Sequence, residues 1–379
     1  MTLFTILDQK RNLKALKNTC KNKRIASSYL FYGNEGSGKE VVALEYAARL
    51  NCESEGHEAC GECPSCIKMG KLEHENLQLV YPVKLKSFAR DSKNPFSSLS
   101  GDQIEEIQAE IQKKAENPYY KFNLSDARSI PISFIRYIKK NIYLSSKSGG
   151  WKVVVILDAH LMTNQAANAF LKVLEEPPKR SIFILTTSKK SDLLPTIKSR
   201  CQQLYFPPLS NEIVAEAIDN QDLAEKELKL IVNLAGGSFS EATWLCEQDI
   251  GEIKSKTIEI LRTLARWDKK AIYNYLDELA RVYKNDSKSF QQLIRSIIFW
   301  FRDAAYIQAG SDKESIIHTD QFTEISNFVE NYPEFQPEKV NRALENCIDL
   351  LERNVYINLA LLEMFFKIRE YAFKRNKNR

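Results

Sequence analysis

One stretch of the chain, residues 151–201, constrains the fold more than any other part of the sequence. It reads WKVVVILDAHLMTNQAANAFLKVLEEPPKRSIFILTTSKKSDLLPTIKSRC. The segments 153–157 and 181–187 are largely apolar, which is typical of strands buried on both faces of a parallel sheet. Residues 164–174 are predicted to form a helix, which ends at the double proline that follows because proline cannot continue the helical hydrogen bonds. The stretch predicts an α/β fold with a parallel sheet.

Size and composition are those of an ordinary soluble protein. The 379 residues are enough for two or three domains, and 44% of them are hydrophobic and 27% charged. No apolar run approaches the roughly 18 residues of a membrane span, and residues 1–14 are too charged for a signal peptide. We therefore expect a cytoplasmic protein with no membrane contact. The net charge of +5 permits nucleic-acid binding without requiring it.

A phosphate-loop motif follows the strand-like segment SYLFY at residues 28–32. The motif has the spacing G-x4-G-K and precedes a predicted helix, whose N-terminus adds positive potential near a bound phosphate. An active loop has Ser or Thr after the lysine, because that hydroxyl binds Mg²⁺. Here the position is Glu40, whose carboxylate would face an anionic triphosphate. The candidate residues of this degenerate nucleotide site are Gly33, Gly36, Gly38, Lys39 and Glu40, with Asp158 and Thr187 at the ends of the two buried strands.

Four of the eight cysteines lie between residues 52 and 66. Their spacing, C-x7-C-x2-C-x2-C, can place four thiolates around one structural Zn²⁺, and in a reducing compartment a metal is favoured over disulfides. The alternative is four unligated thiols in a flexible loop. We interpret the flanking His57 and His74 as surface residues and not as ligands. The candidate ligands are Cys52, Cys60, Cys63 and Cys66.

Residues 84–129 contain a polar, turn-rich segment, 84–102, which we predict to be mobile. A charged helix with one narrow apolar stripe, formed by Ile104, Ile107 and Ile111, follows it. We interpret this part as a surface insertion docked on its parent domain. A helix that binds a partner protein is the alternative.

The chain beyond Cys201 is predicted to be mainly helical. Pro207 and Pro208 end the α/β part, and helical periodicity then continues to the C-terminus with a break at the Gly236-Gly237 pair. The aromatic cluster at residues 299–301 is interpreted as core. One long final helix is predicted from an apolar stripe made of Leu344, Cys347, Leu351, Val355, Leu359, Leu362 and Phe366.

The segment NAFLKVLEEPP at residues 168–178 and the Ser-Arg-Cys sequence at 199–201 resemble the bacterial clamp-loader subunits of the AAA+ class. A cysteine module after the helix that follows the phosphate loop is a further point of resemblance. The likeness covers residues 1–83 and 130–250 through specific motifs, and the remainder only through helical character. It implies an AAA+ P-loop-like domain at 1–207 (zinc module 52–66, insertion about 84–129), a helical lid domain at 208–250 and a helical collar domain at 251–379.

The resemblance also exposes two further departures from an active ATPase. Active relatives have two consecutive acids at the end of the central strand, whereas here Asp158 is accompanied only by Leu157 or Ala159, depending on the register. They also have an arginine that reaches the γ-phosphate, at the position of Ser240. We therefore expect a site that does not hydrolyse ATP. The residues leave open whether it still binds ATP.

By the resemblance, the chain is a structural subunit of the DNA polymerase III clamp loader, which uses ATP to load a sliding clamp onto primed DNA. Arg200 would be catalytic in trans, as an arginine finger in a neighbouring subunit's ATP site. The alternative is a purely structural role, in which Arg200 caps a helix or pairs with a carboxylate such as Asp192. The partners implied are gamma/tau-type and delta-type subunits, bound through the collar and the AAA+ faces, together with the clamp and DNA.

Two other functions compete with this one. The first is a gamma/tau-type motor subunit that hydrolyses ATP itself, which Glu40, the incomplete acidic pair and Ser240 all disfavour. The second is a zinc-stabilised nucleic-acid-binding protein outside any such machine. Basic and aromatic residues are scattered along the chain and form no recognisable binding module, which disfavours it.

Overall fold

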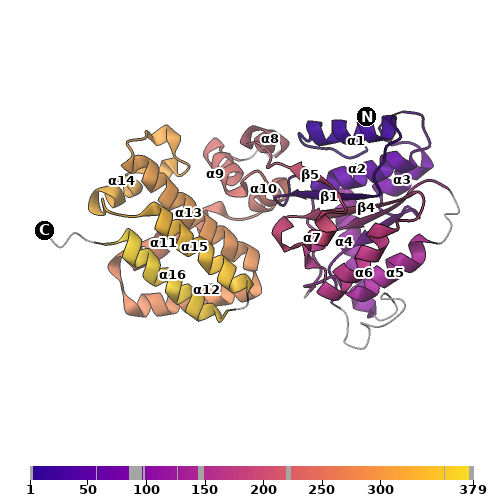
Figure 1. Cartoon of the computed structure of the whole chain (residues 1–379). Coiled ribbons are helices and arrows are strands. Elements are labelled where there is room, and N and C mark those ends of the chain that lie inside the picture. Colours follow the sequence, from indigo (N-terminus) through magenta and orange to yellow (C-terminus); the bar gives the residue numbers. More distant parts are fainter. Residues whose placement is uncertain are drawn as a thin grey trace. The chain divides into compact units, whose positions relative to one another are not determined.

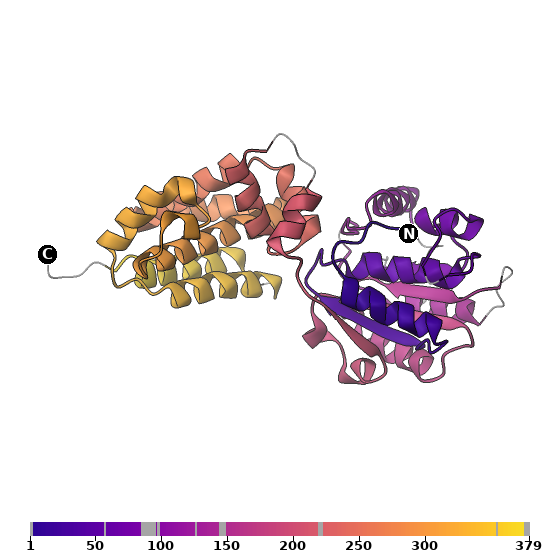
Figure 2. The same cartoon turned by 90° about the horizontal axis from the view of Figure 1, so that it is seen from above.

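The computed structural model describes residues 3–56, 58–84, 96, 99–125, 127–143, 149–218, 223–353 and 355–374 (Figures 1 and 2). Contacts divide the chain into two compact units. They are Met1–Ala217 with Gly237–Glu241, and Ile218–Gly236 with Ala242–Arg379. The division into domains at 1–207, 208–250 and 251–379 stays a prediction. Most of the segment 84–102, which we predict to be mobile, lies outside the described residues, but its last two residues are the start of α4.

The described part of the first unit contains a five-stranded parallel sheet with the strand order β2-β3-β4-β1-β5. Every residue of β4 is buried, and so are four of the five residues of β3, which confirms the two strands predicted from their apolar sequences. The strands are β1 (Ser28–Gly33), β2 (Leu77–Val80), β3 (Lys152–Ile156), β4 (Ser181–Thr187) and β5 (Gln202–Phe206).

Helices cover both faces of this sheet (Figure 1). The connection from β1 to β2 crosses the sheet in one direction, and the later connections return in the other. Because crossovers between parallel strands are right-handed, α2 lies on one face, and α5, α6 and α7 lie on the other. The helices described in this unit are α1 (Lys10–Lys21), α2 (Lys39–Asn51), α3 (Pro64–Gly70), α4 (Gly101–Glu116), α5 (Ile132–Ile142), α6 (Asn164–Glu175), α7 (Pro195–Lys198) and α8 (Asn211–Ala217).

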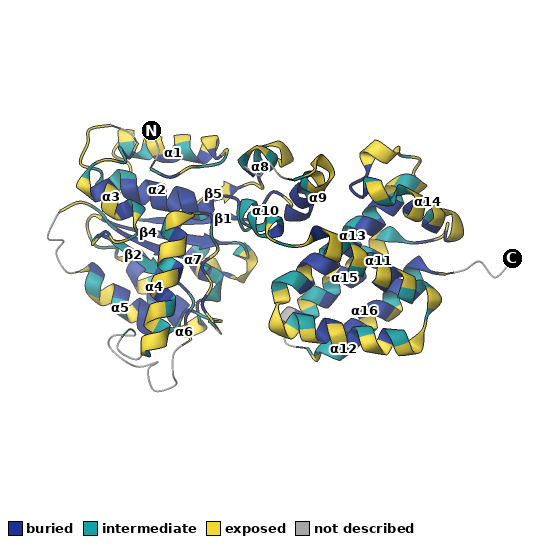
Figure 3. Ribbon diagram, turned by 180° about the vertical axis from the view of Figure 1, so that it is seen from behind, coloured by how far each residue is buried: buried dark blue, intermediate teal, exposed yellow. Residues whose placement is uncertain are grey.

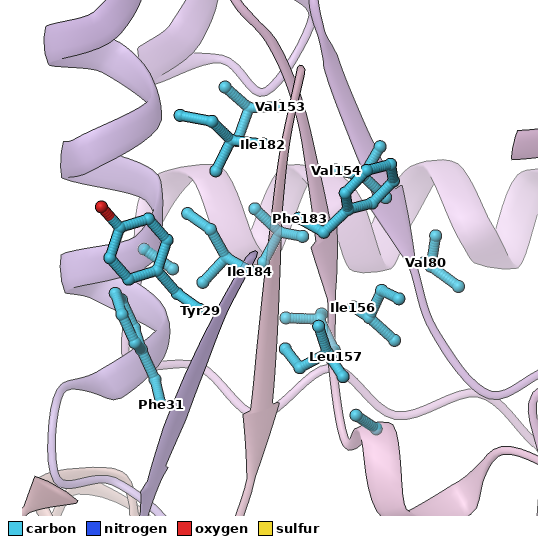
Figure 4. Close-up of a cluster of buried hydrophobic side chains, with 14 of the residues drawn as sticks. Tyr29, Phe31, Val80, Val153, Val154, Ile156, Leu157, Ile182, Phe183 and Ile184 are labelled. Atoms are coloured by element: carbon cyan, nitrogen blue, oxygen red, sulfur yellow. The ribbon is translucent and has the colours of Figure 1, made fainter. Parts of the chain in front are cut away.

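The aromatic rings of Tyr29 and Phe183 lie on opposite faces of the sheet (Figure 4). Tyr29 of β1 lies beside Ile184 of β4 in the strand register, and its ring contacts Tyr46 of α2 at a centroid distance of 5.6 Å. Phe183, one residue earlier in β4, points to the opposite face and meets Phe170 of α6 at 5.4 Å. The central strands are thus apolar on both sides because helices pack on both sides.

The second unit is helical in all its described elements, and their inward faces are buried (Figure 3). α9 (Glu225–Ala235) ends at Gly236 in a left-handed conformation, at the break predicted from the Gly-Gly pair. Trp300 and Phe301 are buried, as predicted for the aromatic cluster. The remaining helices are α10 (Phe239–Cys246), which begins in the first unit, α11 (Ile250–Arg266), α12 (Lys269–Asn285), α13 (Ser287–Gln308), α14 (Phe322–Asn331), α15 (Pro337–Glu352) and α16 (Ile357–Ala372).

The prediction of one long final helix is wrong. α15 ends with the N–H of Arg353 bonded to the carbonyls of Asp349 and Leu351, and α16 starts four residues later and packs against α15. Because the chain reverses between the two helices, the buried face of α16 does not continue the apolar stripe of α15. Leu359 and Phe366 of the predicted stripe are therefore 59% and 53% exposed. The buried residues of α16 are instead Ala360, Leu361, Met364, Phe365, Ile368 and Ala372.

No helix in the described ranges is both long enough and apolar enough to cross a membrane.

A buried carboxylate in α13 anchors the loop that precedes α14. Asp303 is fully buried and accepts hydrogen bonds from the N–H groups of Ile317 and His318, the latter at 2.8 Å. The side chain of His318 makes a third contact, with its Nδ1 at 2.8 Å from the same carboxylate. Burial alone would raise the pKa of Asp303, but the hydrogen bonds from His318 and Ile317 outweigh it and hold the pKa below its ordinary value. The folded state therefore favours the ionised carboxylate.

We expect Asp303→Ala to lower the free energy of unfolding of the second unit by about 3 kcal/mol or more at pH 7, because several buried donors lose their acceptor. A lowered folded-state pKa gives stability that is present above the unfolded-state pKa and is lost as the pH falls. The difference between wild type and variant should therefore shrink below about pH 4. Urea unfolding followed by tryptophan fluorescence measures it, since Trp244, Trp267 and Trp300 all lie in this unit.

Asp320→Ala is the matched control, because Asp320 is half-exposed and pairs with Lys254 at 2.8 Å. Such a pair contributes about 1 kcal/mol or less. Equal losses in the two variants would contradict the anchoring role of Asp303.

Candidate functional site

Three neighbouring strands bring the predicted nucleotide-site residues to one edge of the sheet. β1, β4 and β3 are adjacent and parallel, so their carboxyl ends meet there. The phosphate loop follows β1, Asp158 follows β3, and Thr187 ends β4. Gly36, Gly38, Lys39, Glu40 and Asp158 line one small cavity. Gly33 instead packs on the carbonyl of Phe206, and the Thr187 hydroxyl lies 3.0 Å from Nδ1 of His160.

The loop has the backbone of a phosphate-binding loop. Gly36 and Gly38 have φ angles of 65° and 89°, which only glycine adopts without strain, and Gly38 caps the N-terminus of α2. Lys39 is buried, and its ammonium donates to the carbonyl oxygen of Asn34 at 3.0 Å. Burial lowers the pKa of Lys39, although the nearby carboxylates of Glu40 and Glu35 oppose this effect. The ammonium of Lys39 is thus hydrogen-bonded to the backbone of the loop itself.

The carboxylates at the site do not form the set that a magnesium nucleotide needs. Burial would raise the pKa of Glu40, but Lys114 and then Lys39 hold it below its ordinary value. Asp158 has a left-handed backbone, and burial, together with the charge of Glu40, raises its pKa to about 6. Its neighbour Leu157 is buried in the core. A hydroxyl for Mg²⁺ and a second acid beside Asp158 are both absent from this sequence.

The segment 237–241 lies directly on the loop. A Cβ atom on Gly36 would come within 2.2 Å of the Ser238 hydroxyl and 2.7 Å of the Ser240 hydroxyl. The N–H of Phe239 donates to the carbonyl of Gly36 at 3.2 Å. Ser240, which the resemblance aligns with the γ-phosphate arginine, does line the cavity.

Sequence reasoning missed the residues that the insertion contributes to the cavity, three of which carry polar groups. Lys114, Tyr119 and Lys121 line it, and the ammonium of Lys114 pairs with the carboxylate of Glu40. Lys121 pairs with Glu35 at 2.6 Å. The insertion is docked on its parent domain, as predicted, but no local sequence signal shows that lysines far along the chain reach the loop.

The four cysteines predicted to bind metal lie together, with their sulfur atoms all within 4.8 Å of one another. Backbone N–H groups donate to three of the sulfurs: from Cys60 to Cys52, from Cys63 to Cys60 and from Cys66 to Cys63, at 3.3–3.4 Å. Such donors stabilise thiolates and orient metal ligands. Four sulfurs at this spacing can hold one metal ion and leave no open position for water.

The prediction that His74 is a surface residue is wrong, because its side chain is buried beneath the cysteine module. Its Nδ1 accepts a hydrogen bond from the N–H of Asn76 at 3.0 Å, and its Nε2 lies 2.9 Å from the hydroxyl of Ser65 in α3. That hydroxyl donates to the carbonyl of Asn51 at 2.6 Å. His74 thus connects α2, α3 and β2 beneath the module, and burial lowers its pKa. His57 lies outside the described residues.

Arg200 follows α7 at the surface of the first unit. Its guanidinium donates to the carboxylate of Glu175 at 2.7 Å and to the carbonyl of Thr196 at 3.1 Å. The carboxylate that pairs with Arg200 is therefore that of Glu175, whereas the structural alternative names Asp192 as its example. About a third of the Arg200 side chain, 36%, stays exposed.

The chain matches a protein-family model and is similar in sequence to several known proteins. The family model described as "DNA polymerase III, delta subunit" matches residues 8–210, which is more than half of the 379 residues. The chain is 28% identical over 319 residues to the DNA polymerase III subunit delta' of Bacillus subtilis, covering 84% of this chain and 83% of the relative.

Two further relatives share the likeness. The delta' subunit of Pseudomonas aeruginosa is 29% identical over 246 residues, which cover 64% of this chain and 62% of the relative. The tau subunit of Bacillus subtilis is 26% identical over 373 residues, which cover 92% of this chain but 57% of the relative. With a match to the family model over more than half of its length, the chain belongs to the DNA polymerase III delta subunit family.

Proposed function

We propose that the chain is a non-hydrolysing structural subunit of the DNA polymerase III clamp loader. It would assist the ATP-dependent loading of the sliding clamp onto primed DNA in the cytoplasm. The observation that carries the proposal is a phosphate loop, in a chain of this family, with Glu40 in place of the magnesium-binding hydroxyl and Leu157-Asp158 in place of an acidic pair. The fold of an ATPase is kept while the groups that position Mg²⁺ are missing.

A gamma/tau-type motor subunit is the second candidate, favoured by the 26% identity to a tau subunit over 92% of the chain. A motor must bind Mg²⁺ and polarise the γ-phosphate. Glu40 is already paired with Lys114, and Ser240 stands where the resemblance places an arginine. Both observations favour the structural role. Membership of the family likewise disfavours a nucleic-acid-binding protein outside such a machine.

We propose that the second unit contributes a collar that binds gamma/tau-type and delta-type subunits. Tyr356, Leu359 and Phe366 at α16 are 74%, 59% and 53% exposed, and large apolar side chains exposed together are typical of protein-binding surfaces. Further contacts with neighbouring subunits, with the clamp and with DNA would be made by the faces of the AAA+ domain.

Arg200 would act in the ATP site of a neighbouring subunit. A guanidinium stays charged, and its planar donors match phosphate oxygens, so it can stabilise the charge that develops on the γ-phosphate. The Glu175 carboxylate would hold the side chain in place before the neighbour binds. A subunit without its own chemistry can thereby still complete a neighbour's site.

Zinc is proposed as the metal of the cysteine module, because four thiolates at this spacing suit tetrahedral Zn²⁺. Its role would be local: it joins the end of α2 to α3, whose N-cap residue is Cys63 and whose first turn contains Cys66.

The isolated chain is expected to hydrolyse ATP no faster than its Lys39→Ala variant, because the Mg²⁺ ligands are missing. Phosphate release with excess Mg²⁺ and ATP measures it, with an active gamma/tau-type subunit as the positive control. Turnover that the Lys39→Ala substitution abolishes would establish the motor function instead.

Freshly purified chain should hold about one equivalent of zinc, with Zn–S distances of about 2.3 Å by X-ray absorption. Cys63→Ser and Cys66→Ser should each lose most of the metal. Cys20→Ser, a partly buried cysteine outside the cluster, should keep it. Zinc well below half an equivalent in wild type, or equal loss in the Cys20 variant, would count against the site.

Arg200→Ala is expected to leave assembly of the complex intact while the neighbouring site loses about 10³-fold or more of its hydrolysis rate. The measurement is clamp- and DNA-stimulated ATP hydrolysis by the rebuilt complex. Arg200→Lys keeps the charge but not the planar fork, so it should restore only part of the rate.

Glu175→Ala is the matched control for a merely structural ion pair, because it removes the observed partner of Arg200. We expect it to retain most of the hydrolysis. If Glu175→Ala reproduced the whole defect, or if Arg200→Ala had none, Arg200 would have no role as an arginine finger.

A further inference from the structure

Residues 99–125 of the insertion are held in a fixed shape next to the phosphate loop. α4 begins with a capping box, in which the N–H of Gln103 donates to the Ser100 hydroxyl and the N–H of Ser100 donates to the Gln103 side chain. After the helix the chain returns over it. The buried carboxylate of Glu110 accepts hydrogen bonds from the Tyr120 hydroxyl and the Asn123 N–H, both at 2.9 Å.

Tyr119 joins this return segment to three other parts of the first unit. Its hydroxyl accepts a hydrogen bond from the N–H of Leu7 at 2.8 Å, and its ring meets Phe239 edge-on at 5.0 Å. A Cβ atom on Gly38 would lie 3.2 Å from the same hydroxyl. The tyrosine therefore packs on the glycine that caps α2, at the place where a phosphate loop receives its ligand.

Lys114 and Lys121 supply the positive charge at this position. The Lys114 side chain is 2% exposed, its ammonium donates to the carbonyl of Tyr120 at 2.6 Å, and it pairs with Glu40. Lys121 pairs with Glu35, and this pair is closer to solvent. The ammonium of Lys114 thus neutralises the carboxylate that replaced the magnesium-binding hydroxyl.

The charges at the cavity balance one another without a ligand, and the side chains leave little space between them. Three lysines, 39, 114 and 121, face three carboxylates, those of Glu35, Glu40 and Asp158. The space left between them is about 20 Å³, enough for about one water molecule. Pockets that hold nucleotide-sized ligands are typically about 300–1,000 Å³. A triphosphate could enter only by displacing Tyr119 and separating the Lys114–Glu40 pair.

We propose that residues 114–121 of the insertion are a built-in occupant of the phosphate loop, which takes the place of the nucleotide and excludes it. The residue types also explain why the loop keeps its shape: the inserted lysines and tyrosine supply the charge and contacts that a bound nucleotide would otherwise supply. The inference deepens the proposed function, on which it rests for the interpretation of the loop as a former nucleotide site.

Calorimetric titration of the isolated chain with Mg-ATP tests the exclusion directly. Wild type should show no binding at millimolar ATP, and neither should Glu40→Thr, which restores the hydroxyl position but leaves Tyr119 in place. The variant Glu40→Thr with Lys114→Ala and Tyr119→Ala should bind Mg-ATP with a Kd of about 0.1 mM or tighter, at least about tenfold below the millimolar concentration at which the other two show no binding. Micromolar binding by wild type, or no gain in the opened variant once circular dichroism shows it folded, would overturn the proposal.

Hydrogen exchange supplies a second readout that does not depend on nucleotide binding. Backbone N–H groups of residues 36–41 should exchange at least about tenfold faster in Lys114→Ala than in wild type, because the ion pair that holds the occupant is lost. Lys113→Ala is the matched control, since Lys113 is the adjacent, exposed residue of α4 and should leave exchange unchanged. Unchanged exchange in Lys114→Ala, or equal acceleration in both variants, would also overturn the proposal.

These measurements use the chain alone and do not depend on the clamp loader. A chain that excludes ATP yet joins no complex would refute the proposed function and support the occupant. A chain that joins the complex and binds ATP would support the proposed function and refute the occupant.

Discussion

The parallel pairing of β4 with β1 on one side and β3 on the other is the constraint on which the first unit depends. It buries the central strands on both faces, so helices must cover both sides of the sheet. It also brings the carboxyl ends of three strands to one edge. The phosphate loop, Asp158 and Thr187 lie at that edge for this topological reason, whatever chemistry they retain.

At that edge the chain has kept the backbone of an anion-binding site and changed its charges. Glu40 introduces a negative charge beside Lys39, and such a charge is costly to bury without a partner. Lys114 supplies the partner, and Asp158 is shifted toward its neutral form. The insertion and the residue that replaces the hydroxyl are therefore physically linked: Glu40 places a charge at the loop, and Lys114 of the insertion neutralises it.

Several features could be predicted from the sequence because their signals are local. The strands at 153–157 and 181–187 follow from apolar runs that are too continuous for a half-exposed strand, and the cysteine cluster follows from its spacing. The other features depend on contacts between distant residues. The apolar stripe from 344 to 366 passes through a chain reversal that periodicity does not reveal, and His74 is buried by α3 packing on α2. Lys114 reaches Glu40 across 74 residues of sequence, with no pattern to indicate the pair.

The most direct test of the central claim is to rebuild the clamp loader from the organism's own gamma/tau-type and delta-type subunits, with this chain either wild type or Lys39→Ala. The rate of clamp loading onto primed DNA is the measurement. If the chain is a structural subunit with an unused phosphate loop, loading requires the chain and proceeds at the same rate with either form. Loading that does not need the chain, or that fails with Lys39→Ala in an intact complex, would contradict the account.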